Sequence, residues 1–320
     1  MPDQEIERVP YDEFGLFAEN AFEYGLTVDG APTVRRVDVA LADGRTVSAL
    51  VWGDGPPDSI EVVFVHGGSQ NAHTWDTTIM ALGRSAVAVD LPGHGHSSWR
   101  DDGAYSPMNL ADDVAAVVAE FAPSARLVVG MSLGGLTVME LAVRHPHLVR
   151  SLMMVDITPG VNSAKTKAVL DFVNGPQSFP SFESLLARTK EHNPTRTESS
   201  LRRGILHNAQ QVDDGSWQWR YDRRSHARSD AAASETAEGA PRATEEAAPA
   251  LSPLWHDFAQ IECPLVLVRG SLSPVVDDDD VSEARRRRPS IVVDVIDGAG
   301  HSIQGDRPVE LAALIARTLG

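Results

Sequence analysis

The sequence of 320 residues predicts an α/β fold, in which a mostly parallel, twisted sheet of about eight strands is covered by helices. Short, nearly all-apolar runs recur along the chain, and each leads into glycine or aspartate, as expected of strands buried on both faces. Helical apolar patterns lie between several of these runs. The apolar runs are 61–65, 85–89, 126–129, 152–155, 264–268 and 291–295, and the helical patterns are 110–121, 133–144, 279–288 and 309–319.

The limits of this core are indicated by changes in the pattern. Residues 1–33 are predicted to form an N-terminal extension with one short helix around residues 14–24. Two β-like runs, 36–41 and 47–52, flank Ala42-Asp43-Gly44, which is typical of a hairpin turn. The core is therefore expected to comprise residues 34–158 and 256–320.

The alternation of strands and helices breaks between residues 159 and 255, which we interpret as a helical cap inserted after the sixth strand. Within it, residues 229–253 are rich in Ala, Glu, Ser, Thr and Pro, and this composition predicts a mobile segment. Trp217, Trp219 and Tyr221 alternate with polar residues and would share one face if extended. That face could pack against the core or line a ligand pocket, and the sequence leaves both open.

The amino-acid composition limits the classes of molecule that the protein is expected to bind. A formal net charge of −17 argues against nucleic acid or an anionic membrane surface. Cys263 is the only cysteine, the N-terminal residues show no secretory signal, and no apolar run approaches the roughly 20 residues that span a bilayer. We therefore expect a cytoplasmic protein that acts on a small molecule, and its oligomeric state remains open.

The run Gly130-Met131-Ser132-Leu133-Gly134 lies where a strand pattern ends and a helical pattern begins. A tight turn at this place holds the central serine in a strained backbone conformation, and the glycines leave room for the chain to reverse. The Ser132 hydroxyl is then presented above the sheet, at the positive end of the following helix. This placement predicts that Ser132 is a nucleophile.

A serine nucleophile needs a base and donors for the oxyanion. The base is predicted to be His301, in a glycine-containing loop directly after the last apolar run. One oxyanion-hole N–H is expected from Leu133 and the other from Gly68, with Ser69 as an alternative. His66, in the same loop, is expected to brace the loop.

Four motifs occur in a fixed order, and together they resemble the α/β-hydrolase superfamily, in its serine-nucleophile esterase, thioesterase, lactonase and C–C hydrolase branch. A serine in the elbow argues against the branches that use an aspartate nucleophile. The motifs are Phe64-Val65-His66-Gly67-Gly68, Val89-Asp90-Leu91-Pro92-Gly93-His94-Gly95-His96-Ser97, Gly130-Met131-Ser132-Leu133-Gly134-Gly135 and Gly298-Ala299-Gly300-His301.

The acid of a catalytic triad is the least defined member. The resemblance implies an aspartate after the seventh strand, but Ser273 occupies that position here. Some members of the family carry the acid after the sixth strand instead, where this chain has Asp156. We predict Asp156 as the acid, because an aspartate that closes an apolar strand needs a hydrogen-bonded partner and the histidine would supply one. Asp277, slightly farther along, is expected to begin a solvated helix.

The sequence thus predicts a serine hydrolase in which Ser132, Asp156 and His301 form the triad and Gly68 and Leu133 hold the oxyanion. A carboxylic ester, lactone or thioester with an apolar acyl part is the expected substrate. The resemblance implies neither a metal nor an organic cofactor. Two alternatives stay open: a C–C bond hydrolase for a β-diketone-like substrate, and a non-hydrolytic receptor of the same fold.

Overall fold

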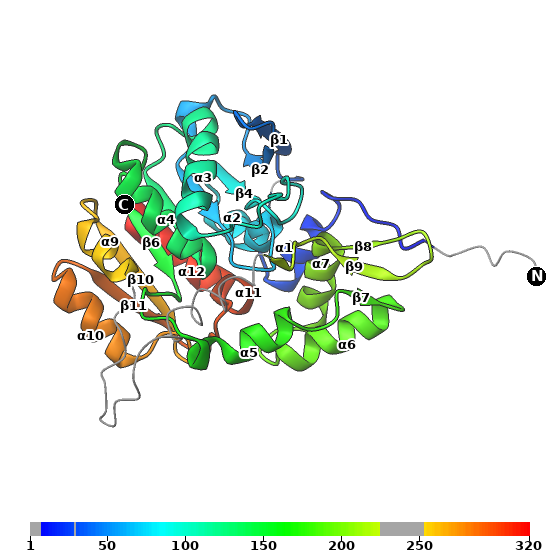
Figure 1. The fold of residues 1–320 in the computed structure, drawn as a ribbon. Coiled ribbons are helices and arrows are strands. Elements are labelled where there is room, and N and C mark those ends of the chain that lie inside the picture. Colours follow the sequence, from blue (N-terminus) through cyan, green and yellow to red (C-terminus); the bar gives the residue numbers. More distant parts are fainter. Residues whose placement is uncertain (1–7, 29, 225–252) are drawn as a thin grey trace, which may run out of the picture.

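The core of the protein is an eight-stranded sheet in the order β1-β2-β4-β3-β5-β6-β10-β11 (Figure 1). The computed structural model describes residues 8–28, 30–224 and 253–320. Strands β4 to β11 of this order run parallel, whereas β2 is antiparallel to both of its neighbours. The strands are β1 (Val34–Ala40), β2 (Thr46–Trp52), β3 (Val62–Val65), β4 (Ala86–Val89), β5 (Leu127–Met131), β6 (Leu152–Val155), β10 (Leu265–Gly270) and β11 (Val292–Ile296).

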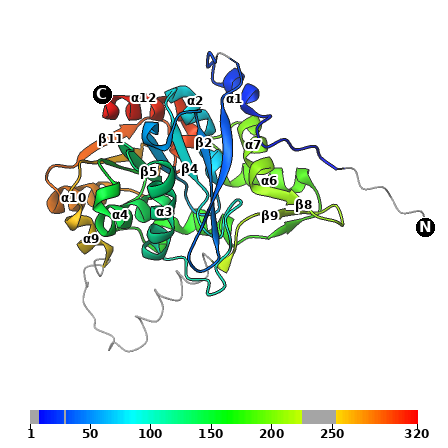
Figure 2. The same cartoon turned by 90° about the horizontal axis from the view of Figure 1, so that it is seen from above.

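Helices cover both faces of this sheet, as the continuous apolar strands predict. Strand residues alternate between two buried clusters: Val63 and Val65 face α3, α4, α9 and α10, whereas Val62 and Phe64 face α1, α2 and α12. Figure 2 shows the two helical layers on either side of the sheet. The helices are α1 (Phe17–Glu23), α2 (Asp76–Leu82), α3 (Pro107–Phe121), α4 (Leu133–Arg144), α9 (Leu254–Gln260), α10 (Asp278–Arg287), α11 (Ile303–Asp306) and α12 (Pro308–Leu319).

The described part of the segment between β6 and α9, residues 157–224 and here called the insertion, has its own apolar core. Its helices are accompanied by a three-stranded antiparallel sheet in the order β7-β9-β8, which the sequence did not predict because each strand has only two or three residues. Its elements are α5 (Ser163–Val173), β7 (Ser178–Phe179), α6 (Phe182–His192), α7 (Glu198–Asn208), β8 (Ala209–Gln211) and β9 (Trp217–Trp219).

The aromatic residues of the insertion occupy its core. Trp217 contacts Phe182 edge to face at 5.1 Å, and Trp219 stacks on Tyr221 at 5.8 Å. All three aromatic side chains are buried, and they pack in the insertion's own apolar cluster instead of against the sheet. The predicted mobile segment 229–253 lies outside the described residues except for its last position.

The N-terminal segment connects the insertion to the core. The Tyr11 hydroxyl is 2.8 Å from His207 Nδ1 on α7, and Glu23 forms an ion pair with Arg203 on the same helix. Both views show α1 near α7 (Figures 1 and 2). Across the described ranges, no helix combines the length and apolar character that crossing a membrane requires.

Candidate active site

Ser132 lies at the junction of β5 and α4, as predicted. Its backbone has φ 52° and ψ −120°, a left-handed φ that side chains rarely adopt. The chain can pack closely around this turn because Gly134 has no side chain. A Cβ on Gly134 would collide with the carbonyl oxygens of Val65 and His66. The strained turn directs the Ser132 hydroxyl to the carboxyl edge of the parallel strands.

The structure brings Ser132, His301 and Asp156 into one hydrogen-bonded line. His301 Nε2 is 3.1 Å from Ser132 Oγ, and His301 Nδ1 is 2.7 Å from Asp156 Oδ2. When the Nδ1 proton faces the carboxylate, Nε2 is left as an acceptor for the serine hydroxyl. This arrangement can deprotonate the hydroxyl and stabilise the imidazolium that results.

Asp156 directly follows β6 and is fully buried. The Gly270 N–H donates to its Oδ1 at 3.0 Å, and the Ser273 hydroxyl donates to its Oδ2, the oxygen that faces His301. These donors satisfy a charge that would otherwise be costly to bury. The residue at the family's commoner acid position is therefore a hydrogen-bond donor to Asp156, a contact that sequence reasoning missed.

Asp277 lies elsewhere. It is the N-cap of α10, where its carboxylate accepts the Asp280 N–H at 2.9 Å and pairs with Lys165 at 2.8 Å. Its side chain is 48% exposed. The cap hydrogen bond and the Lys165 charge outweigh partial burial and hold the Asp277 pKa below its usual range. The solvated helix start expected from the sequence agrees with this placement.

The loop that carries His301 is held from two sides. Asp306 accepts the Gly300 N–H at 2.7 Å and the Thr195 hydroxyl at 2.9 Å, and Thr195 belongs to the insertion. On the other side, Gln70 Nε2 donates to Ser302 Oγ at 3.4 Å. Both the insertion and the loop after β3 therefore position the histidine.

The loop after β3 passes next to the nucleophile. A Cβ on Gly67 would lie 3.2 Å from Ser132 Cβ, so only glycine leaves this space free. Gly68 follows Gly67, and Ser69 has a left-handed φ of 61°, held by a hydrogen bond of 2.6 Å from Asn208 Nδ2 to its carbonyl. Leu133 begins α4, where N–H groups lack an intrahelical acceptor. Both predicted donors thus flank the Ser132 region, and their role in an oxyanion hole stays a prediction.

His66 has the bracing contacts predicted for it. Its Nε2 accepts the Leu91 N–H at 2.9 Å and its Nδ1 is 2.7 Å from the Gly67 carbonyl oxygen. Burial lowers the His66 pKa, which favours the neutral ring that these contacts need.

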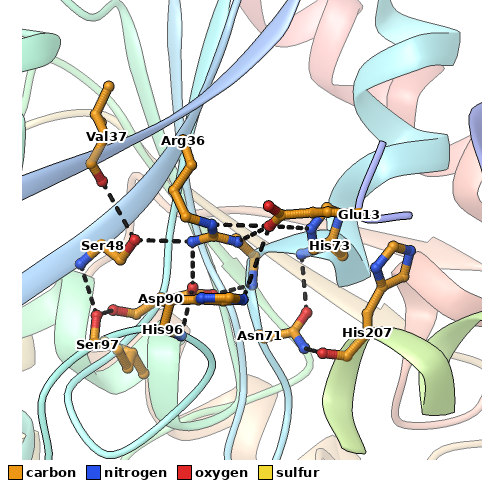
Figure 3. Close-up of polar contacts among 12 residues, drawn as sticks. Glu13, Arg36, Val37, Ser48, Asn71, His73, Asp90, His96, Ser97 and His207 are labelled. Atoms are coloured by element: carbon orange, nitrogen blue, oxygen red, sulfur yellow. Dashed lines mark hydrogen bonds and ion pairs between the residues drawn. The ribbon is translucent and has the colours of Figure 1, made fainter. Parts of the chain in front are cut away.

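Beneath this loop lies a buried ionic network, drawn in Figure 3. Asp90 accepts the Ala72 N–H at 2.7 Å and an Arg36 N–H at 2.8 Å, and Arg36 also pairs with Glu13. Burial tends to raise the Glu13 pKa, but hydrogen bonds from His73 and Arg36 outweigh it and lower that pKa to about 2. The N-terminal segment is thereby bound to the loop that precedes α2.

His73, Asp76 and His207 are the described residues whose donor atoms could converge on a metal ion, because these atoms lie within 4.8 Å of one another. The donor types suit a transition metal. However, the two rings stack in parallel at 3.8 Å and 8°, and both His73 nitrogens already face carboxylates, Asp76 at 2.9 Å and Glu13 at 3.1 Å. A metal would have to turn one ring and displace these hydrogen bonds.

A cavity of about 130 Å³ lies between α7 and the core, next to the catalytic loops. Ser69, Gln70 and Ser302 line one part of it, and they are sequence neighbours of Gly68 and His301. Trp219 also lines it, so this aromatic residue both packs and faces the cavity. Much of the lining is polar. No pattern in the sequence predicts this lining, because it depends on how α7 lies against the core.

The fold and this arrangement of side chains define a class of protein, and the comparisons agree. The sequence profile of the Alpha/beta hydrolase family matches residues 62–314, which is most of the chain. The chain belongs to this family, as the sequence motifs predicted.

Comparison with individual proteins is more specific than the match to the family. The esterase Rv0045c of Mycobacterium tuberculosis is 42% identical over 316 residues, which cover 96% of each protein. A crystal structure of that esterase matches 98% of this chain and 99% of its own with a TM-score of 0.79. The 2-(acetamidomethylene)succinate hydrolase of Mesorhizobium japonicum is 29% identical over 278 residues, covering 86% of this chain and 90% of its own.

Proposed function

We propose that this protein is a serine esterase that cleaves a small carboxylic ester through an acyl-enzyme intermediate. The observation that carries the proposal is the line from Ser132 Oγ through His301 to the buried Asp156 carboxylate. The 42% identity to an esterase over nearly the full length supports the same reaction class.

In the proposed reaction, His301 Nε2 takes the Ser132 proton while Oγ attacks the ester carbonyl. The Leu133 and Gly68 N–H groups stabilise the oxyanion, and the Asp156 carboxylate orients His301 and stabilises its charged form. The leaving alcohol receives the proton from His301. Water activated by the same histidine then hydrolyses the acyl-enzyme and releases the acid.

In this proposal the insertion acts as a cap over the catalytic edge of the core. The substrate carries an apolar acyl part, as predicted from the sequence. Thr195 and Asn208 support this role, because they connect the insertion to the His301 loop and to the Ser69 carbonyl respectively. We further propose a cytoplasmic location, in keeping with the single cysteine and the acidic composition.

Covalent labelling tests the proposal. A fluorophosphonate probe should modify Ser132, located by peptide mass spectrometry, and Ser132→Ala should abolish both labelling and hydrolysis of p-nitrophenyl esters. Rates across p-nitrophenyl esters of increasing length, lactones, acyl-thioesters and β-diketones then define the bond that is cleaved. Labelling without turnover on any of them would favour the receptor alternative, and faster turnover of β-diketones would favour a C–C hydrolase.

A further inference from the structure

The cavity beside the catalytic loops is lined by one polar face of α7. Arg196, Ser200, Arg203 and His207 recur at intervals of three or four positions, so they follow the same side of the helix and of its N-terminal approach. All four line the cavity. This face therefore determines the charge of the space into which a substrate could extend.

Arg196 forms no direct ion pair in the part of the chain that the structure describes, although the Asp306 and Glu23 carboxylates act on it from farther away. Its Nη2 donates to Ser200 Oγ at 2.7 Å and to the Ser200 carbonyl at 3.4 Å, both uncharged acceptors. Its Nε is buried without a hydrogen-bond partner. Burial lowers the Arg196 pKa, which is the direction expected for a cation withdrawn from water without a paired anion.

The position of Arg196 just before α7 does not favour a positive charge, so the contribution of this side chain to stability does not explain its presence. It directly precedes Thr197, the N-cap of α7, and the N-terminal end of a helix favours anions and disfavours cations. A partly buried cation without an ion pair adds no stability to the fold. A role in binding accounts for a cation at this place.

Arg203 contributes a second donor to the same cavity. Its guanidinium is bound to Glu23 and to the Ser199 hydroxyl, so its charge is compensated. Its Nε, like that of Arg196, is buried without a hydrogen-bond partner. The cavity thus has two arginine side chains in its lining, each with an Nε that has no hydrogen-bond partner, and Arg196 forms no direct ion pair.

The cavity also lies next to the proposed site of chemistry, because sequence neighbours of Gly68 and His301 line it. Ser302 and Gln70 line it, and the former directly follows His301. Gln304 lines it as well and donates to Gln70 Oε1 at 3.3 Å. An ester whose carbonyl lies at Ser132 could therefore place a second group between α7 and these loops.

We propose that this cavity binds an anionic oxygen group of the substrate, a carboxylate or a phosphate, and that Arg196 selects for it. The inference rests on the proposed esterase function and adds to it a substrate class, namely esters that carry a second, negatively charged group. The planar guanidinium suits both anions, because its N–H groups can bind two oxygens together. The methylene chain between the ester and the anion would supply the apolar acyl part.

A matched set of esters tests the proposal. The p-nitrophenyl hemiester of glutaric acid is compared with its uncharged methyl diester, and with a p-nitrophenyl butyrate that carries a terminal phosphate. We expect kcat/KM for at least one anionic ester to exceed that for the uncharged diester by about tenfold or more, the scale of a hydrogen bond to a charged group. The better of the two anions identifies the group that the cavity accepts.

Arg196→Met should reduce kcat/KM for the preferred anionic ester at least about tenfold more than for the uncharged diester. Arg196→Lys, which keeps the charge and loses the planar donors, should retain part of the preference. The matched control is Arg202→Met on the same helix, because Arg202 is exposed, pairs with Glu19 at 3.3 Å and does not line the cavity. Arg202→Met should leave the ratio of rates unchanged.

A binding measurement separates this inference from the proposed function. Glutarate should raise the Tm of Ser132→Ala, which cannot turn over ester, and the shift should vanish in Ser132→Ala/Arg196→Met. If wild type hydrolyses charged and uncharged esters equally and glutarate leaves the Tm unchanged, the anion site is overturned while the esterase proposal stands. If glutarate binds through Arg196 but Ser132→Ala still hydrolyses ester, the anion site stands and the serine mechanism fails.

Discussion

His301 and Asp156 are 145 positions apart in the chain, yet Nδ1 of the histidine lies 2.7 Å from Oδ2 of the aspartate. The same carboxylate receives the Ser273 hydroxyl from the end of the neighbouring strand. The acid and the residue at the commoner acid position thus meet at one point, because β6 and β10 are adjacent parallel strands that end at the same edge.

Asp156→Asn should lower kcat about 10²–10⁴-fold, because an amide would hold His301 in the wrong tautomer. Asp277→Asn should change kcat less than about fivefold, since a solvated N-cap contributes only to local helix stability. Both variants are measured with one good ester substrate. The assignment of the acid fails if Asp277→Asn is the inactive variant.

The contact between Ser273 and Asp156 suggests that the acid can be moved. Asp156→Asn/Ser273→Asp should have a kcat at least about tenfold higher than that of Asp156→Asn. The reason is that the side chain of residue 273 lies next to the oxygen of residue 156 that faces His301, so a carboxylate there is close to the histidine. Asp156→Asn/Ser273→Asn serves as the uncharged control and should recover nothing. Equal activity of the two double variants would contradict the prediction.

Ser132→Ala and His301→Ala should each reduce ester turnover by ~10³-fold or more. The double variant should be little worse than either single one, because the members of a triad act as a unit. Steady-state kinetics of the three variants on one ester provides the measurement. Multiplicative losses would mean that the two side chains act independently.

Asn208→Ala should lower kcat more than it raises KM. Asn208 donates to the Ser69 carbonyl at 2.6 Å and so holds the left-handed backbone next to the predicted oxyanion donor Gly68. A displaced donor would weaken transition-state stabilisation. Asn109→Ala, whose amide donates to the Ala104 carbonyl at 3.1 Å and which does not line the cavity, is the control and should have the smaller effect on kcat. An effect confined to KM would show that Asn208 serves substrate binding instead.

The free energy of unfolding should fall between pH 6.5 and about 9 because of His73. Burial alone would lower its pKa, but the carboxylates of Asp76 and Glu13 outweigh burial and raise it to about 9, while neighbouring His207 stays neutral. The folded state therefore holds a proton that the unfolded chain releases near pH 6.5, so the stabilisation is complete below that pH and is lost as pH rises through 9.

Urea titrations at pH 6 and at pH 9.5 measure this effect. Wild type should lose on the order of 3 kcal/mol of unfolding free energy to His73 over the range. His73→Gln should remove most of this dependence, whereas the exposed His147→Gln should keep it. A wild-type stability that rises from pH 6 to pH 9.5 would contradict the assignment.

The sequence predicted the long helices of the core and of the insertion more fully than the short helix between β3 and β4. The patterns at 133–144 and 309–319 correspond closely to α4 and α12. A long amphipathic run with one buried face fits a helix and no other regular structure. It did not predict α2, which has seven residues and mixes Asp76 and threonines with apolar residues on a largely buried surface.

By itself the sequence determined the elements whose signal is local: the strands of the eight-stranded sheet, the long helices, and the turn that presents Ser132. Only the tertiary structure decided which carboxylate meets His301, that Ser273 donates to it, and that Arg196 lines a cavity without a direct ion pair. The physical reason is how far apart in the sequence the interacting residues lie. A strand or helix follows from the spacing of its own apolar residues, whereas hydrogen-bond partners and buried charges depend on segments that meet only after the sheet and the insertion have packed.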